Sequence, residues 1–446
     1  MTVLSGTWPK LTSSEEFRFL SDLVLTRSSA DQTIVRLRDH HAGTTRFANN
    51  QVIQNVDARR GSLAVTVAFG GQQGTASTTD FTAGAIQDAL ARAERIARVS
   101  PVDPEYLPPP DPCLFPVRAT AKPETLAAGP VKRLEYANEA IGHCRMENLM
   151  AAGVVASSGT AVGIAASNGL FGYEVRGDAR FSLTVQTGDA TGWSAAAHRS
   201  IDHLKVQERT LAAIAKAKRG RDVCEMPAGE YPVILEPAAV AGLWAWVLWS
   251  LDAKSYTKGT SPFAGKLGQA IVDERLTLKN HPDHADLLGE GFTHDGLPST
   301  ASLWIDHGVL KQLAYDRFTA KADGINPIPT LEAPALSIAG APAQSIQDLI
   351  KNTDRAILVT NFWYIRPVNP QDLTLTGMTR DGTFLIEKGE IVSAVKNFRF
   401  HESPIRAFRY ITAWTTPMEA VNSETGKMLV PALALPHFRF SSVTRF

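Results

Sequence analysis

Residues Glu230–Asp252 have the sequence EYPVILEPAAVAGLWAWVLWSLD, and no other stretch is as informative about the fold. The apolar segment Tyr231–Leu235 predicts a strand, and the longer apolar run after it predicts a helix. Many zinc peptidases carry two histidine ligands and a catalytic glutamate on such a helix. This one holds Ala, Val, Leu and Trp but no histidine, so on a peptidase scaffold it could not bind a catalytic zinc ion.

Three tryptophans, Trp244, Trp246 and Trp249, make the predicted helix apolar on nearly every side. A helix that is apolar all round is buried. We therefore expect it to lie in a core or, alternatively, to anchor a partner subunit through its aromatic side chains.

The first half of the chain contains a strand-rich block twice, and each block is followed by a helix pattern. The first has strand patterns at 33–38, 44–54 and 62–69 and a helix pattern at 82–99; the second has strand patterns at 161–166, 172–176 and 180–186 and a helix pattern at 202–218. Five pairs match at a constant offset of 118: Asn50 with Asn168, Thr66 with Thr184, Val67 with Val185, Gly70 with Gly188 and Gly74 with Gly192. We expect residues from about 30 to 220 to form a pseudo-symmetric α+β unit.

The second half of the chain is dominated by strand patterns. Candidate strands are 302–305, 309–315, 356–364, 383–387, 390–395 and 407–414, and two of the connections, Lys388-Gly389 and His307-Gly308, are hairpin signals. An antiparallel sheet or a partly closed barrel is the expected core here. The predicted fold class is α+β. An N-terminal domain, 1–222, would contain the repeat and an extended, proline-rich connection at 101–130, and a mostly antiparallel, barrel-like domain would follow at 223–446.

Composition excludes several classes of protein. Lys+Arg and Asp+Glu both number 45, which argues against a protein dedicated to nucleic acid. The basic cluster that begins at Lys216 is interpreted as a solvated helix end. Three scattered cysteines suit a reducing compartment, the N-terminus lacks a signal-peptide pattern, and the apolar run at 240–251 is too short to span a bilayer. We therefore expect a cytoplasmic protein.

Several segments, taken in their order along the chain, resemble the TldD/TldE family, also called TldD/PmbA. They are RFANN (46–50), EYPVILEP (230–237), FAGKLG (263–268), IVDE (271–274), THDGLPS (293–299), LTGMTRDG (375–382) and IEKGEI (386–391). The resemblance covers nearly the whole chain. It implies a cytosolic protein of a family whose members pair as heterodimers. One subunit is a zinc metallopeptidase with an HExxxH motif and a later cysteine ligand, and the other lacks the metal site and completes the substrate chamber.

The resemblance places the positions of the zinc motif at Glu236, Pro237 and Ala241. None of the three is the residue that the motif requires, and no cysteine follows Cys224. Zinc needs three protein ligands, and proline cannot act as a general base. The chain is therefore identified as TldE-like, without a catalytic residue, metal or cofactor of its own, and zinc is expected on the partner subunit.

Other residues remain candidates for a site. His281 and His284, within HPDHAD, form the rival metal motif, although a mobile polar loop is the simpler interpretation. His294 and Asp295 lie in a segment that the family places near the substrate cleft, and Thr379 and Arg380 are further candidates for substrate binding. For His294 the alternative is a bystander in a turn formed by Asp295 and Gly296.

The sequence thus predicts a non-catalytic subunit of a zinc peptidase pair that binds unfolded peptide, in the extended form that can add to a sheet edge. Its partner would be a TldD-like subunit or a second copy of the chain. Two alternatives stay open. One is an active metal-dependent peptidase with a relocated site, and the other is a homodimeric binding protein for peptide or nucleic acid.

Overall fold

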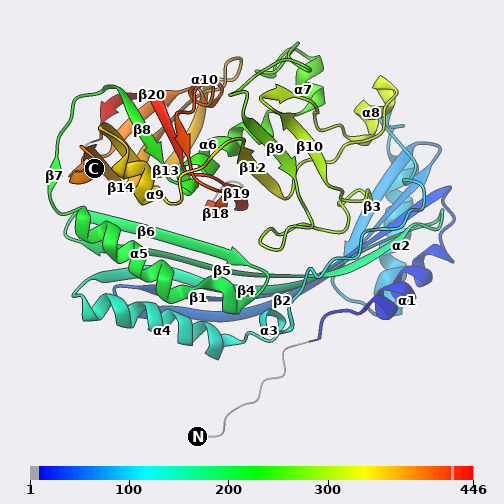
Figure 1. Ribbon diagram of the computed structural model, residues 1–446. Helices are drawn as coiled ribbons and strands as arrows, with labels where there is room; N and C mark the ends of the chain where they lie inside the picture. Colours follow the sequence, from blue (N-terminus) through cyan, green and yellow to red (C-terminus); the bar gives the residue numbers. More distant parts are fainter. Residues whose placement is uncertain (1–9, 423–425, 445–446) are drawn as a thin grey trace, which may run out of the picture.

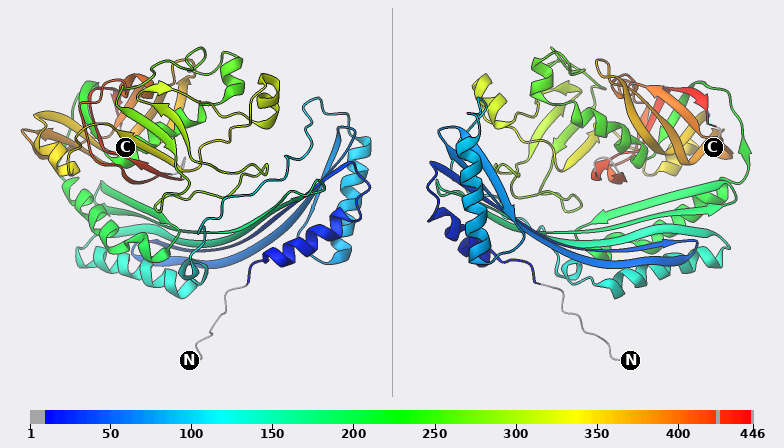
Figure 2. Two further views of the ribbon diagram at one scale, coloured as in Figure 1. Left: turned by 45° about the vertical axis from the view of Figure 1, so that its right-hand side comes forward. Right: turned by 180° about the vertical axis from the view of Figure 1, so that it is seen from behind.

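The computed structural model describes residues 10–422 and 426–444. A long, curved sheet forms the N-terminal half, and the C-terminal half lies over the concave side of that sheet (Figures 1 and 2). In the described part of the chain, no helix is long and apolar enough to cross a membrane.

The curved sheet is antiparallel and has six strands in the order β3-β2-β1-β4-β5-β6. Their bounds are β1 (Gln32–Ala48), β2 (Gln51–Phe69), β3 (Gln72–Thr78), β4 (Met150–Ala166), β5 (Phe171–Thr187) and β6 (Ala190–His198). The accompanying helices are α1 (Ser14–Leu25), α2 (Ala83–Val99), α3 (Pro123–Leu126), α4 (Pro130–Met146), the 3₁₀ turn η1 (Ile201–Leu204) and α5 (Val206–Arg219).

The internal repeat predicted from the sequence is confirmed. Strands β1 and β4 begin and end 118 residues apart, as the offset requires, and they pair with each other at the centre of the sheet. In that pairing His41 lies opposite Gly159, its own equivalent in the repeat. A pseudo-twofold axis therefore passes between these two strands.

Gly74 and Gly192 are equivalent in the repeat and show why it needs glycine at this position. A Cβ atom on Gly74 would lie 2.2 Å from the carbonyl oxygen of Ala93 in α2, and one on Gly192 would lie 2.2 Å from that of Ala213 in α5. Each glycine lets a helix backbone lie directly against a strand. The sequence match at these positions thus reflects one packing solution used twice.

The proline-rich connection is extended for most of its length, but it contains the short helix α3, which the sequence analysis did not predict. The backbone amide of Gly177 donates to the carbonyl oxygen of Thr120 at 2.7 Å, so the connection lies along β5. The domain limits 1–222 and 223–446 stay a prediction.

The C-terminal half contains a barrel and a second sheet. The barrel strands β13 (Arg355–Asn369), β8 (Gly229–Leu235), β20 (Leu433–Val443), β16 (Phe398–Glu402) and β14 (Thr374–Glu387) pair in that order, and β13 closes onto β14. Further pairing partners are β7 (Val223–Cys224), β15 (Glu390–Val395) and β17 (Ala413–Trp414). The pairs are antiparallel except for β13 with β8 and β15 with β7, which confirms the mostly antiparallel, barrel-like prediction.

The second sheet has the order β11-β10-β9-β12-β19-β18. Its strands are β9 (Leu276–Asn280), β10 (Ser302–Asp306), β11 (Val309–Leu310), β12 (Pro334–Ile338), β18 (Met418–Asn422) and β19 (Gly426–Val430). The helices of this half are α6 (Pro237–Trp249), α7 (Ala253–Thr257), α8 (Arg317–Asp323), α9 (Ile346–Lys351) and α10 (Pro404–Ala407). The strand predicted at 407–414 is wrong except at its end, because α10 occupies the residues up to Ala407 and only Ala413–Trp414 is strand.

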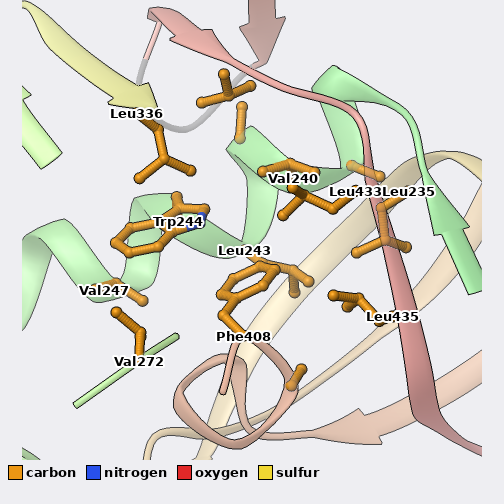
Figure 3. Packing of buried hydrophobic residues seen from close by; sticks show 14 of the residues in the cluster. Leu235, Val240, Leu243, Trp244, Val247, Val272, Leu336, Phe408, Leu433 and Leu435 are labelled. Atoms are coloured by element: carbon orange, nitrogen blue, oxygen red, sulfur yellow. The ribbon is translucent and has the colours of Figure 1, made fainter. Parts of the chain in front are cut away.

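Helix α6 lies at the centre of the largest apolar cluster of the C-terminal half (Figure 3). Trp244 is fully buried and stacks on Phe408 with ring centroids 5.4 Å apart. Trp249, at the end of the helix, keeps 51% of its surface exposed and meets Trp246 edge-on. Core burial therefore explains most of the helix, while its last turn reaches the surface.

Candidate functional site

The position assigned to the first zinc ligand is occupied by an ion pair between the two halves of the molecule. Glu236 caps the N-terminus of α6, where its backbone amide donates to the carbonyl oxygen of Val359 at 3.0 Å. Its carboxylate accepts a hydrogen bond from Lys216 Nζ, in the last turn of α5, at 2.6 Å. The two side chains are only 16% and 19% exposed. The prediction of a solvated Lys216 is therefore wrong, because the C-terminal half covers this end of α5.

The residues at this point do not fit a zinc ion. Pro237 is the first residue of α6, Ala241 is fully buried, and neither has a side-chain donor for a metal. The one carboxylate present is already neutralised by an ammonium group. Within residues 10–422 and 426–444, no group of three or more His, Cys, Asp or Glu side chains could hold a metal ion.

Asp381 lies close to this ion pair and is a buried carboxylate in an unusual backbone conformation. Its φ of 59° is in the left-handed region, which is rare for a residue other than glycine. Burial raises the pKa of Asp381, whereas Thr191, Arg380 and Lys216 act in the opposite direction. Its Oδ1 atom is buried and has no hydrogen-bond partner among the described residues, whereas its Oδ2 atom lies 3.7 Å from Arg380 Nε.

Two cavities meet at Asp381. The first, of about 530 Å³, lies between the curved sheet and the barrel and is lined by residues of β5, β6, α6, β13 and β14; we call it the inter-half cleft. The second, of about 600 Å³, continues on the other side of Asp381, where it is bordered by Thr191 of β6 and Asn397. Both are large enough for several residues of a peptide.

Strand β6 runs along both cavities and is the last strand of the curved sheet. Its Trp193, Ala195 and Ala196 line the inter-half cleft. At the far end of β6 the carbonyl oxygen of Ala197 accepts a hydrogen bond from the buried ammonium group of Lys427. An edge strand beside an open cavity offers backbone groups to an extended chain.

The four residues predicted to bind substrate do not come together in one pocket. Arg380 lines the inter-half cleft. Thr379 is buried in the barrel wall, where its hydroxyl donates to Asn397 Oδ1 at 3.2 Å and accepts from the Phe398 amide at 2.9 Å. The loop of His294 and Asp295 instead contacts β1, because Arg36 Nε donates to the carbonyl oxygen of His294 at 3.1 Å. Burial, followed by the nearby Arg36, lowers the pKa of His294.

His281 and His284 lie in a different cavity, of about 720 Å³, and two further histidines join them there. These are His198, at the end of β6, and His203, in η1, whose rings stack 4.6 Å apart. Asp286 lies between the two pairs: its carboxylate oxygens are each 4.0 Å from a ring nitrogen, of His198 on one side and of His284 on the other. No local sequence pattern indicates this grouping, because its members belong to different halves.

Comparison with known proteins places the chain in a family. Three family models match it: PmbA/TldA metallopeptidase domain 1 over residues 35–97, the central domain over 122–220 and the C-terminal domain over 228–444. Together they cover most of the chain. A search of curated proteins finds no significant match.

Solved structures with the same fold cover nearly the whole chain. TldE from Thermococcus kodakarensis superimposes with a TM-score of 0.85 at 20% identity, over 96% of this chain and all of that one. Two proposed modulators of DNA gyrase, from Thermotoga maritima and Bacteroides thetaiotaomicron, each give 0.83, at 18% and 16% identity, over 95% and 97% of this chain and all of theirs. At such identities the likeness establishes the fold alone. The matches of all three family models go further, and the chain belongs to the PmbA/TldD family of metallopeptidase-like proteins.

Proposed function

We propose that this chain is a TldE-like, metal-free subunit that pairs with a zinc-bearing TldD-like subunit in the cytoplasm and holds unfolded peptide for cleavage by that partner. The observation that carries the proposal is the Lys216–Glu236 ion pair. The sequence resemblance assigns the first metal ligand of the family's metallopeptidases to Glu236, and here that residue caps a helix and binds an ammonium group. A site so filled has neither an open coordination position nor a general base.

The inter-half cleft supports the peptide-binding part of the proposal. It runs beside the edge strand β6 and is bounded on its other side by the barrel strands β13 and β14. A peptide that adds to this edge would be held mainly through its backbone, with side chains alternately facing the two walls. Such binding tolerates many sequences, as a subunit that handles unfolded chains requires.

The test is to express the tagged chain in its native host, isolate it, and identify the subunit that copurifies with it. Peptidase activity against an unfolded, fluorescently labelled protein is then measured for the pair and for each subunit alone, together with the zinc content of each. We expect activity from the pair and zinc on the partner only. A pair whose partner has its motif glutamate replaced by glutamine is the matched control and should be inactive.

The relocated-metal alternative rests on the four-histidine cavity and is tested in the same preparation. Stoichiometric zinc on this chain alone, lost in a His281→Ala/His284→Ala variant, would establish that alternative and exclude the metal-free subunit. If the chain instead purifies as a homodimer that binds DNA with a strong salt dependence, the nucleic-acid alternative is supported.

A further inference from the structure

Strand β2 of the curved sheet has a long stretch of unpaired edge. It runs for 19 residues, but β3 pairs with its outer side only from Leu63 to Phe69. Among the described residues, no strand pairs with the outer side of β2 before Leu63. Residues 53–60 are all exposed, and we call them the open edge. Such an edge presents backbone donors and acceptors with which another extended chain can pair.

The equivalent edge in the second half of the repeat is covered. Residues 171–178 of β5 correspond to the open edge at the offset of 118, and none of them is exposed. The proline-rich connection lies along them: the carbonyl oxygen of Thr120 accepts from the Gly177 amide at 2.7 Å, and its hydroxyl donates to the Val175 carbonyl oxygen at 2.6 Å. On the open edge the equivalent groups belong to Arg59 and Asp57, and no segment of the described chain lies along them in this way. The repeat therefore closes one edge with its own chain and leaves the other open.

The open edge lacks most of the features by which exposed strands avoid pairing with other chains. Its register against β1 is regular from Gln54 to Gly61, so no bulge turns it aside. It contains neither proline nor lysine. Two of its apolar side chains reach solvent, since Ile53 is 65% and Val56 is 45% exposed.

Its charged side chains give little further protection, because two of the three are engaged within the chain. Asp57 forms an ion pair with Arg133 at 2.7 Å, and Arg59 forms one with Asp39 at 2.6 Å; the side chains of Arg133 and Asp39 are fully buried. The Asp57 side chain is only 24% exposed, although the residue as a whole is exposed, so it is largely backbone that faces solvent there. Arg60 remains as the third charge.

We infer that the open edge is the docking surface for the second subunit, whose own β2 edge adds to it antiparallel and joins the two curved sheets into one. The inference rests on the proposed function and names the surface through which the pair forms. Members of one family share the fold, and a twofold arrangement lets one contact close both open edges. The eight residues 53–60 offer a longer pairing than the seven that join β3 to β2.

A peptide substrate is the less suitable occupant of this edge. Strands β1, β4 and β5 separate β2 from β6, which borders the inter-half cleft. A peptide bound along the open edge would therefore lie apart from the cleft that the proposed function assigns to substrate.

The first test is amide hydrogen exchange, measured by mass spectrometry on the chain alone and on the copurified pair. Strand addition gives the outward amides of the open edge hydrogen-bond acceptors. We expect exchange within residues 53–60 to slow at least about tenfold in the pair, with no change at the already covered residues 171–178.

The second test replaces an exposed residue of the open edge. Val56→Lys introduces the side chain that natural edge strands use against pairing, and it should reduce the recovery of the second subunit at least about tenfold. Leu211→Lys is the matched control, because Leu211 is 47% exposed but lies on α5, and its replacement should leave recovery unchanged. Circular dichroism and urea unfolding establish that both variants are folded, and the exchange measurement needs no variant.

Unchanged exchange at the open edge in the pair would overturn the inference and leave the proposed function standing, and so would full recovery of the second subunit with Val56→Lys. Absence of any copurifying subunit would overturn both. Slow exchange in the chain alone that becomes fast when residues 1–9 are deleted would overturn the inference, because the occupant would then be the chain's own N-terminal segment. Protection of the edge by an unfolded peptide alone would do the same. A second copy of the chain as the copurifying subunit, with the edge protected, would support the docking surface and contradict the heterodimer.

Discussion

Replacing Lys216 with methionine should destabilise the junction between α5 and α6, because it leaves the carboxylate of Glu236 without its cation. The pair has an Nζ–Oε2 distance of 2.6 Å, and its side chains are 19% and 16% exposed. Removing one member of a fully buried ion pair costs about 3–5 kcal/mol, and exposed pairs contribute about 0.2–1 kcal/mol. Since this pair retains some solvent contact, we expect the free energy of unfolding to fall by about 1–3 kcal/mol.

The measurement is urea unfolding, followed by both tryptophan fluorescence and far-ultraviolet circular dichroism. Glu236→Gln and the double variant Lys216→Met/Glu236→Gln complete a mutant cycle, whose coupling term isolates the interaction. Lys218→Met is the control, because Lys218 lies on the same helix and forms an ion pair with Glu147 near the surface. The side chains of this pair are 42% and 44% exposed, far more than those of Lys216 and Glu236. We expect a loss of at most about 1 kcal/mol there.

A coupling term of about 0.3 kcal/mol or less would refute the expected stabilisation by the ion pair, because two sites that do not interact deviate from additivity by about that much. Equal effects of Lys216→Met and Lys218→Met would refute it as well. Either outcome would mean that the ion pair at the position predicted for the first zinc ligand contributes no more to stability than a surface contact does.

Three further predictions concern packing, pH and thiol reactivity. Gly192→Ala should lower the free energy of unfolding in urea by about 1–3 kcal/mol or more, because the added Cβ atom would meet the α5 backbone. Gly142→Ala is the control: a Cβ atom there would have no neighbour within 4 Å among the described residues, so this variant should be neutral or stabilising by about 0.5–1 kcal/mol. Burial raises the pKa of Glu332 to about 7, so between about pH 4.5 and 7 the folded chain keeps this carboxyl protonated while the unfolded chain loses the proton. The free energy of unfolding should therefore fall as pH rises through that range, and Glu332→Gln should flatten its dependence on pH. An unchanged slope in the variant would contradict the assignment. Cys113 is exposed and should react quickly with a thiol reagent. Cys144 is buried, and burial raises its pKa to about 11, so it should react only after the protein unfolds. Thiol labelling followed by peptide mapping distinguishes the two cysteines.

Much of the fold was predictable because its signals are local. The 118-residue offset predicted the repeat, since equivalent close approaches of a helix to a strand need the same residue, as Gly74 and Gly192 show. The hairpin signals were also reliable, because Lys388 and His307 adopt the left-handed conformation that a two-residue turn needs. The predicted strand at 407–414 failed because its apolar residues serve a short helix and an irregular segment.

The candidate site was predictable only in part. Thr379 and Arg380 are neighbours in sequence, but successive residues of a strand face opposite sides, so Thr379 lies in the barrel wall and Arg380 faces the cleft. Asp381 lines the same cleft as Arg380 because its left-handed conformation interrupts that alternation. A strand pattern does not reveal such a bulge, and this residue was missed.

The sequence alone determined that Glu236, Pro237 and Ala241 cannot provide a zinc site, because side-chain chemistry does not depend on the fold. It also determined the repeat, because the periodicity of apolar residues and turns is written along the chain. Only the tertiary structure decided that Lys216 neutralises Glu236 and that β6 and the bulged strands β13 and β14 share one cleft. Those contacts join residues from different halves, and they depend on how the barrel lies over the curved sheet, which no local pattern encodes.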